Sequence, residues 1–271
     1  MVSGDLHTIL SARMLGSLVV TLNGIAVDTS SSRRTRQVLA FLLLHRRAAV
    51  SRDVLMDTFW PTASPEAARN NLHVALSGVR QALRVASPAS VLQRRHDTYR
   101  LDADETWVDV EDFGRYCAEG RRADRAGDAA TAVRCYAAAD QLYEGDLLAD
   151  DPYLNWVSLQ RESMRLEVVQ AQRRLAELYA ANGDHAGAVL IARRALGIDP
   201  YDEAVHRQLM LSFSDVGQLH LALAQYQRCA NLLWQAFQVR PSPQTAYLSE
   251  QLRRREPEVT TAQGAIAGRR A

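Results

Sequence analysis

The sequence contains no lysine, so all 32 basic residues among its 271 positions are arginines. A phosphate-binding P-loop, a protein-kinase site and Schiff-base chemistry each depend on a lysine side chain, and these kinds of site are therefore excluded. Apolar runs of roughly eighteen residues or more are also missing, which excludes a membrane-spanning helix. Because the N-terminal residues lack the basic, apolar and small-residue segments of a secretion signal, we expect a cytoplasmic protein without a membrane partner.

Residues that hold metals or perform catalysis are also few. The three cysteines, Cys117, Cys135 and Cys229, are odd in number and widely spaced, which argues against a disulfide framework and a thiolate metal site. The seven histidines form no H-x-x-x-H pair. Because no arrangement of a nucleophile, a base and a charge-stabilising group is found either, we expect no enzyme activity, no metal site and no cofactor.

The charge changes sign along the chain, although its net value is only +1. Residues 1–100 carry 13 arginines and 6 acidic residues (+7), residues 101–151 carry 5 and 14 (−9), and residues 152–271 carry 14 and 11 (+3). A basic first third followed by an acidic segment is typical of a nucleic-acid module attached to a different module. A chance fluctuation of surface charge is the alternative.

Residues 64–84 predict one amphipathic helix with a well-defined start. Ser64 suits the N-cap, Pro65 suits the first helical position, and Glu66 complements the positive end of the helix dipole. An apolar stripe recurs at helical spacing: Ala68, Leu72, Ala75, Leu76, Val79 and Leu83. The other side carries groups of the size that reach base edges: Asn70, His73, Val74, Ser77, Gln81 and Arg84, with Arg69 and Arg80 beside them. The alternative is the solvated outer face of an ordinary core helix.

The segments around this helix have the order of a winged helix-turn-helix. Residues 13–28 predict a hairpin at Asn23-Gly24 whose first strand is covered on both faces, residues 33–45 and 52–60 predict helices, and residues 91–101 predict a second hairpin. In such a domain the longest helix enters the major groove and the second hairpin, the wing, touches the DNA backbone. The strands ahead of the first helix resemble the OmpR-like type.

Basic side chains are predicted to neutralise DNA phosphates at two places. The helix that begins at residue 33 has arginines in its first turn, where they oppose the helix dipole unless an anion lies there, and a phosphate is the natural candidate. The wing is basic as well. The predicted backbone contacts are Arg33, Arg34, Thr35 and Arg36 in the helix, and Arg94, Arg95, His96, Tyr99 and Arg100 in the wing.

From Val110 onward the sequence predicts helices, with an internal repeat. Gly183 and Gly217 lie 34 residues apart and are followed at matching distances by small residues, as is Gly127 in a looser copy. A glycine between two closely crossing helices is typical of tetratricopeptide repeats. Residues 153–182 contain neither glycine nor proline and predict one long helix packed inside this array.

Together these features resemble the Streptomyces antibiotic regulatory protein family, which joins an OmpR-like winged helix to a tetratricopeptide-type bacterial transcriptional activator domain. The similarity spans residues 13–254 and is carried by residues 34–40, 50–61, 67–83, 99–101, 143–148, 175–195, 206–210 and 239–243. The wing departs from the family pattern, because His96-Asp97-Thr98 stand where the family usually has glycines.

This resemblance implies a mainly α protein, in which an N-terminal winged helix-turn-helix of small α+β type precedes an all-α tetratricopeptide-like helical array. The expected parts are a flexible N-terminus (1–12), the winged helix (13–102), the activator domain (109–255) and a disordered tail (256–271). A fragment that lacks residues 102–271 is expected to retain weak DNA binding.

The function implied by the resemblance is sequence-specific activation of secondary-metabolite genes, such as those of antibiotic biosynthesis. The protein is expected to bind direct repeats in double-stranded DNA as a homodimer and to recruit the RNA polymerase holoenzyme, including its sigma factor. The main alternative is a tetratricopeptide interaction adaptor whose winged helix docks protein rather than DNA. The basic first third argues against that alternative.

Overall fold

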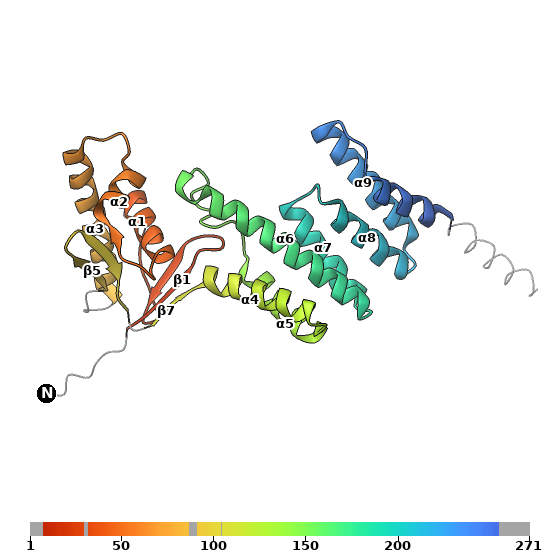
Figure 1. Ribbon diagram of the computed structural model, residues 1–271, viewed down its shortest axis with the longest axis horizontal. Helices are drawn as coiled ribbons and strands as arrows, with labels where there is room; N and C mark the ends of the chain where they lie inside the picture. Colours follow the sequence, from red (N-terminus) through yellow and green to blue (C-terminus); the bar gives the residue numbers. More distant parts are fainter. Residues whose placement is uncertain (1–7, 30–31, 87–90, 104, 255–271) are drawn as a thin grey trace, which may run out of the picture. The chain divides into compact units, whose positions relative to one another are not determined.

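The computed structural model describes residues 8–29, 32–86, 91–103 and 105–254, and divides the chain into two compact units. The first unit consists of the residues up to Phe113 together with Leu142–Arg161, and the second of Gly114–Gln141 and the residues from Glu162 onward. The predicted fold class is confirmed, since the chain is mainly helical and a small α+β winged domain precedes a helical array (Figure 1). The first unit extends beyond the predicted domain 13–102, because it includes a segment of the expected activator region.

The first unit opens with a mixed β-sheet. Within the described residues its strand order is β3 (Ile25–Ala26), β2 (Val19–Leu22), β1 (Ile9–Arg13) and β7 (Glu105–Val108). Strand β1 is antiparallel to β2 and parallel to β7. The predicted hairpin at Asn23-Gly24 is confirmed between β2 and β3, where the two residues have φ of 52° and 78°, the left-handed pair that a tight hairpin turn requires.

Two expectations for this sheet need correction. Residues from Ile9 onward lie in β1 and not in a flexible N-terminus, because Leu10 and Ala12 alternate into the core and are fully buried. Residues 1–7 of that expected segment lie outside the described residues, as does the expected disordered tail. The strand predicted to be covered on both faces has one open face, since Val19 is half exposed while Val20 is buried.

The predicted helices of the first unit are present, each with a serine at its N-cap. They are α1 (Arg33–Leu44), α2 (Arg52–Phe59) and α3 (Pro65–Ala86). The hydroxyl oxygens of Ser32, Ser51 and Ser64 accept backbone N–H groups three residues further on, at 3.4, 3.2 and 3.3 Å. A second sheet, in the order β4 (Val50–Ser51), β6 (Thr98–Leu101) and β5 (Leu92–Arg95), contains the predicted wing hairpin.

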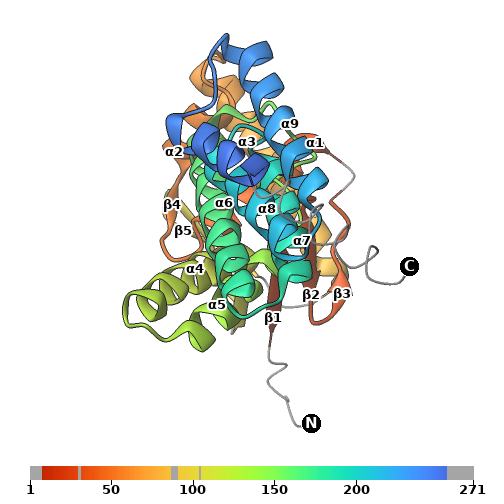
Figure 2. The ribbon, with the colours of Figure 1, turned by 90° about the vertical axis from the view of Figure 1, so that its right-hand side faces the viewer.

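The helices of the array follow in pairs (Figures 1 and 2). They are α4 (Asp109–Arg125), α5 (Ala129–Leu142), α6 (Ser158–Ala181), α7 (His185–Ile198), α8 (Glu203–Asp215) and α9 (Leu219–Phe237), and residues 243–254 are helical as well. Gly127, Gly183 and Gly217 lie between paired helices with φ of 76° to 79°, a conformation that costs glycine little. The predicted positions of the repeat glycines are thus confirmed.

The long helix predicted for residues 153–182 starts later than expected. Helix α6 begins at Ser158 after one turn of 3₁₀ helix, Asn155–Val157, and residues 143–154 form a loop, here called the 143–154 loop. The tertiary contacts explain this start, because Trp156 packs against Phe41 and Phe59 with ring centroids 5.1 and 6.0 Å away. Packing of this aromatic cluster outweighs the local preference for helix.

Candidate nucleic-acid interface

Helix α3 buries its apolar stripe and exposes the face that the sequence assigned to base contacts. The stripe residues are at most 4% exposed: Ala68, Leu72, Ala75, Leu76, Val79 and Leu83. On the other side Val74 is 71% exposed. The polar residues around it are also exposed, apart from the half-buried Arg80: Arg69, Asn70, His73, Ser77, Gln81 and Arg84. Hydrogen-bonding groups, one apolar group and arginines on one long helix are the set that reads base edges in a major groove.

Helix α3 is held close to α1 at Gly78. A Cβ atom on Gly78 would lie only 2.6 Å from Thr35 Oγ1, so the two helices approach at a point where a side chain does not fit. Thr35 is 3% exposed and packs into this contact. Its predicted contact with the DNA backbone is therefore corrected, because the side chain belongs to the core between α1 and α3.

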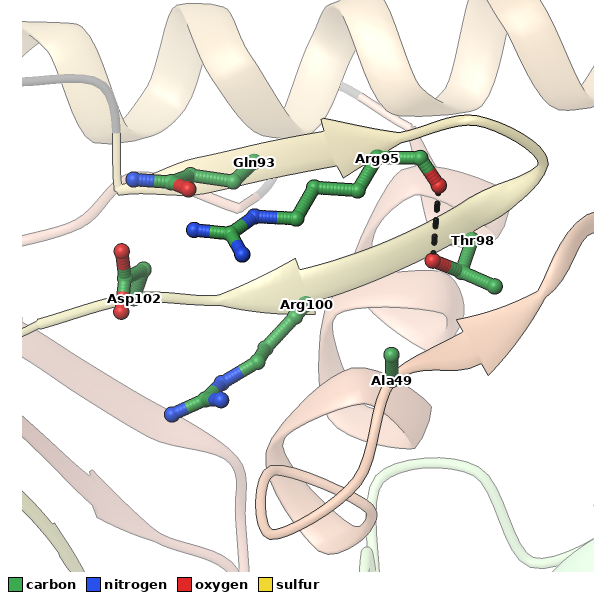
Figure 3. A pocket seen from close by; sticks show the side chains of 6 residues that line it. All are labelled: Ala49, Gln93, Arg95, Thr98, Arg100 and Asp102. Carbon is green, nitrogen blue, oxygen red and sulfur yellow. Dashed lines mark hydrogen bonds between the residues drawn. The ribbon is translucent and has the colours of Figure 1, made fainter.

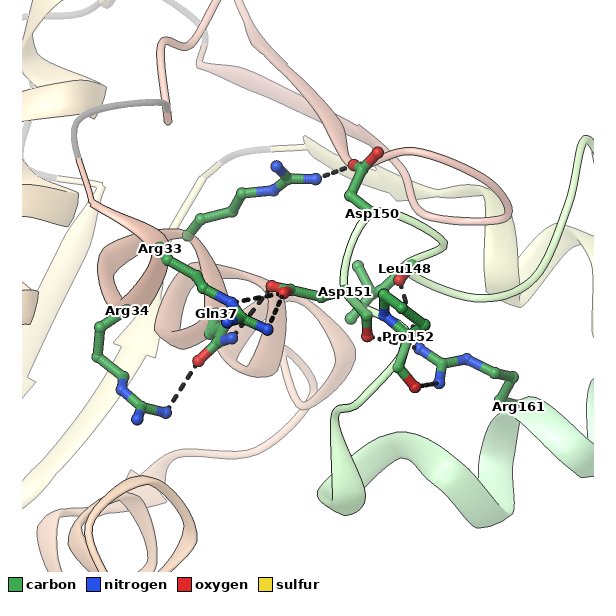
Figure 4. Close-up of polar contacts among 9 residues, drawn as sticks. Arg33, Arg34, Gln37, Leu148, Asp150, Asp151, Pro152 and Arg161 are labelled. Atoms are coloured by element: carbon green, nitrogen blue, oxygen red, sulfur yellow. Dashed lines mark hydrogen bonds and ion pairs between the residues drawn. The ribbon is translucent and has the colours of Figure 1, made fainter.

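The first turn of α1 is occupied by carboxylates of the 143–154 loop (Figure 4). Arg33 Nε donates to Asp151 Oδ1 at 2.6 Å, and Gln37 Nε2 donates to Asp151 Oδ2 at 3.0 Å. Arg36 forms an ion pair with Asp150. The carboxylates of Asp150 and Asp151 therefore lie at the first turn of α1, where the sequence predicted a DNA phosphate. The Arg33 side chain is still 66% exposed and that of Arg36 is 28% exposed, so DNA contact by these two residues stays a prediction.

Arg34 lies between these contacts and the end of α2. Its Nη1 donates to Gln37 Oε1 at 2.9 Å, and its guanidinium carbon lies 5.5 Å from the centroid of the Trp60 ring and 5.8 Å from that of Phe59. Cation–π contact of this kind holds an arginine without neutralising its charge. Arg34 is exposed and keeps its positive charge available to a DNA phosphate.

One face of the wing carries two arginines beside an open cavity of about 200 Å³ (Figure 3). In the register of β5 and β6, Gln93 lies opposite Arg100 and Arg95 lies opposite Thr98, so these four side chains share one face. Arg95 and Arg100 both extend along this face (Figure 3). Two guanidinium groups on one open surface provide the charge and the donors that a phosphate group requires.

The tip of the wing is shaped without glycine. His96 adopts φ of 53°, its carbonyl accepts from Arg94 Nε at 2.9 Å, and Thr98 Oγ1 donates to the Arg95 carbonyl at 2.8 Å. Asp97 is tied to α2, because its carboxylate accepts from Arg52 Nη1 at 3.0 Å and its carbonyl accepts from the Arg52 backbone N–H at 2.7 Å. These bonds supply the turn geometry without glycine.

The predicted DNA contact of Tyr99 is also corrected. Tyr99 is 6% exposed, because along β6 Tyr99 and Leu101 point inward while Arg100 points outward. The residues that the sequence reasoning missed are Arg52, Asp150 and Asp151. The acidic composition of residues 101–151 is the one sequence signal for Asp150 and Asp151, and it does not identify the arginines with which they pair.

Two further observations concern the described residues as a whole. They contain no helix long and apolar enough to span a bilayer. They also contain no group of three or more histidine, cysteine, aspartate or glutamate side chains suited to a metal ion.

Comparison with protein families gives two adjacent matches. The family described as "Bacterial transcriptional activator domain" matches residues 108–253, and the one described as "Transcriptional regulatory protein, C terminal" matches residues 28–101. The second match contains α1, α2, α3 and the wing, and the first contains the helical array.

Similar whole proteins are transcriptional or regulatory proteins by name. The Regulatory protein DnrI of Streptomyces peucetius is 30% identical over 256 residues, which cover 91% of this chain and 93% of that protein. The Transcriptional regulatory protein EmbR of Mycobacterium tuberculosis is 30% identical over 250 residues, covering 90% of this chain and 63% of EmbR. A solved structure of M. tuberculosis EmbR in complex with a low-affinity phosphopeptide has a TM-score of 0.75 at 26% identity, covering 96% of this chain and 71% of that one.

Proposed function

Since the chain belongs to the Streptomyces antibiotic regulatory protein family of transcriptional regulators, we propose that it is a sequence-specific activator that binds direct repeats in double-stranded DNA near a promoter. The observation that carries the proposal is the exposed face of α3, where Asn70, Ser77 and Arg84 accompany the 71%-exposed Val74. Amide, hydroxyl and guanidinium groups read hydrogen-bonding base edges, and a valine suits a thymine methyl group.

Contacts with the DNA backbone are proposed for the arginines around this face. Arg69 and Arg80 flank it on α3, Arg34 lies at the first turn of α1, and Arg95 and Arg100 share the open face of the wing. Each such contact releases counterions from the DNA, so affinity should fall steeply with salt. Thr35 and Tyr99 are left out because both are buried.

The remaining parts of the proposal follow from family membership. Residues 13–102 would supply DNA reading and residues 109–255 the activator array, with 142–161 serving both. The protein would bind tandem sites as a homodimer in the cytoplasm and recruit the RNA polymerase holoenzyme, including its sigma factor, to secondary-metabolite genes. Similarity to the Regulatory proteins DnrI and AfsR of Streptomyces supports this assignment.

The proposal is tested by selecting fragments from the source genome that bind the full chain and sequencing them. A repeated motif spaced by about one helical turn of DNA is expected upstream of a gene cluster. The double variant Asn70→Ala/Ser77→Ala should lose the motif. Arg228→Ala on α9, which removes one exposed arginine elsewhere in the chain, should keep it.

A salt titration separates this function from a protein-docking adaptor. DNA binding through several phosphates should give a log–log slope of about −0.9 per contact, and Arg95→Ala should make the slope less steep by about one contact. No enrichment over bulk DNA at moderate salt would contradict the proposal and favour the adaptor.

A further inference from the structure

The most enclosed arginine described in the first unit is Arg161, in the first turn of α6. It is 8% exposed, and its guanidinium donates to four backbone carbonyls of one loop. These are Leu147 at 2.9 Å and, as Figure 4 shows, Pro152 at 2.8 Å, Asp151 at 3.2 Å and Leu148 at 3.3 Å. A planar guanidinium that binds four carbonyls fixes their relative positions, which a flexible point charge such as lysine does not. Arg161 therefore determines the shape of the 143–154 loop.

The loop in turn is bonded to residues 14–18, which connect β1 to β2. The backbone N–H of Leu148 donates to the Met14 carbonyl at 2.8 Å, and that of Ala149 donates to the Gly16 carbonyl at 2.8 Å. Asp150 accepts from Ser17 Oγ at 2.7 Å and from the Leu18 backbone N–H at 3.1 Å. These bonds place the carboxylates of Asp150 and Asp151 beside α1.

Both carboxylates act on the first turn of α1. Asp151 is 7% exposed and joins Arg33 to Gln37, while Asp150 pairs with Arg36. Asp151 is the buried charge of this network, and with Gln37 also buried the carboxylate tolerates little displacement, because the loss of its partners would leave it uncompensated. The loop thus restrains the position of the α1 N-terminus.

Helix α1 then restrains α3 through a contact that leaves no free space. Thr35 lies in the same turn as Arg33 and Arg36. Its side chain lies so close to Gly78 of α3 that a Cβ atom on Gly78 would be only 2.6 Å from Thr35 Oγ1. Close-packed helices move together rather than independently. A shift of the α1 first turn would therefore be passed to the helix whose outer face is proposed to read DNA.

We propose that Arg161 is a positioning residue for DNA binding, which acts through the 143–154 loop and the first turn of α1 on the orientation of α3. This inference rests on the proposed function in one respect, namely that α3 binds DNA. It assigns part of the activator region, residues 142–161, to the DNA-reading machinery.

The test compares full-length Arg161→Gln with the wild type and with Arg173→Gln, which removes an arginine from a later turn of the same helix. Hydrogen–deuterium exchange should become faster in α1 and α3 of Arg161→Gln and stay unchanged in α8 and α9. Binding to a short random-sequence duplex is measured by fluorescence anisotropy, at a temperature at which circular dichroism shows that the wild type and Arg161→Gln are folded. The Kd of Arg161→Gln should be roughly 2- to 30-fold higher than that of the wild type. Arg173→Gln should leave both measurements at the wild-type value.

Asp151→Asn provides a second variant, because it leaves the four carbonyl bonds of Arg161 in place and weakens only the next link. It should reproduce the faster exchange of α1 and α3, and it takes the place of Arg161→Gln if that variant does not fold. A role confined to stability would lower the unfolding temperature and leave the α3 exchange and the Kd of the folded protein unchanged, which would overturn the proposal.

A lower Kd in either variant would also overturn it, since Asp150 and Asp151 would then be competitors of DNA phosphates for Arg33 and Arg36. If the wild type itself binds neither the duplex nor genomic fragments, the proposed function fails. In that case the exchange of α3 alone decides whether Arg161 positions this helix.

Discussion

At the scale of single residues, the three arginines at the start of α1 show why charge alone does not locate a DNA contact. Arg33 binds a carboxylate that comes from a residue 118 positions later in the chain, whereas Arg34 binds an amide and faces two aromatic rings. Arg36 pairs with Asp150. A guanidinium has five donors in a planar fork and can contact a carboxylate, an amide oxygen or an aromatic ring. The partner is therefore decided by the fold around each arginine.

Base contacts and backbone contacts should respond differently to truncation. We expect Arg84→Ala, on the exposed face of α3, to cost about 1–3 kcal/mol of binding free energy and to relax the preference at one base position. Arg34→Ala should weaken binding to all sequences about equally, because a phosphate contact carries no sequence information. The measurement is a set of Kd values for an enriched genomic fragment and its single-base variants. Uniform weakening by both substitutions would show that Arg84 does not face a base.

The contact between Thr35 and Gly78 predicts that Gly78→Ala destabilises the wild type but stabilises a variant that lacks the Thr35 side chain. Gly78→Ala places a Cβ 2.6 Å from Thr35 Oγ1 and 3.0 Å from its Cγ2. We expect overpacking of about 1–3 kcal/mol to exceed the gain of about 1 kcal/mol that alanine brings to a helix, so the free energy of unfolding should fall. In a Thr35→Ala background, which removes both crowded atoms, the same substitution should be stabilising. Urea unfolding measures both effects, and the same sign in both backgrounds would contradict the packing argument.

The residue scale also shows what the sequence predicts well. The apolar stripe of α3 was predictable because it depends only on local periodicity and a local cap. The inward position of Tyr99 was available too, since the alternation of residues 98–101 pairs it with Leu101. The burial of Thr35 was not, because it depends on the absence of a side chain at Gly78 on another helix.

At the scale of elements, α8 contains a histidine whose charge state should affect stability. His206 is fully buried, with Nε2 3.0 Å from the Pro200 carbonyl and Nδ1 2.6 Å from Gln225 Nε2. A neutral ring with its proton on Nε2 satisfies both bonds. Burial lowers the pKa of His206, and the charge of Arg228 acts in the same direction, whereas the bond to the Pro200 carbonyl and the charges of Asp202 and Glu203 oppose it.

This lowered pKa predicts a pH dependence of known sign. The unfolded chain takes up a proton near pH 6.5, the ordinary pKa of histidine, while the folded chain does not until a lower pH. The free energy of unfolding should therefore fall as the pH decreases below about 6.5, by at most about 1.4 kcal/mol per pH unit, until the folded-state pKa is reached. Urea unfolding followed by circular dichroism over this range measures the slope. His206→Gln should reduce the slope, and an equal slope in this variant would assign it to other groups.

At the scale of the whole molecule, the sequence predicted two modules but not their exact composition. The helical repeat and the winged helix are visible because each follows from patterns within short windows. The placement of Leu142–Arg161 in the first unit follows instead from contacts between residues far apart in sequence, such as Met14 with Leu148 and Phe41 with Trp156. Local periodicity carries no information on such pairs. The basic and acidic segments that suggested separate modules thus meet within a single unit.

This composition changes the expectation for a fragment that lacks residues 102–271. Such a fragment lacks β7, which pairs with β1, and Trp156, which packs on Phe41 and Phe59. It also leaves Arg33 and Gln37 without Asp151. Trp156 is half-buried, so the fragment loses its ring contacts together with the pairing of β1 with β7 and the bonds of Asp151. Several losses at once are large relative to the roughly 5–15 kcal/mol stability of a typical domain.

We therefore expect the fragment to unfold without cooperativity and to lose DNA binding, in contrast to the weak binding that the sequence suggested. A longer fragment ending at Ala181 retains the described first unit and the whole of α6, and should unfold cooperatively and keep binding a short duplex. Thermal unfolding by circular dichroism and fluorescence anisotropy with that duplex compare the two fragments. If the shorter fragment unfolds cooperatively and binds DNA, its own core is sufficient for folding. Residues 142–161 would then be dispensable to the DNA-reading unit.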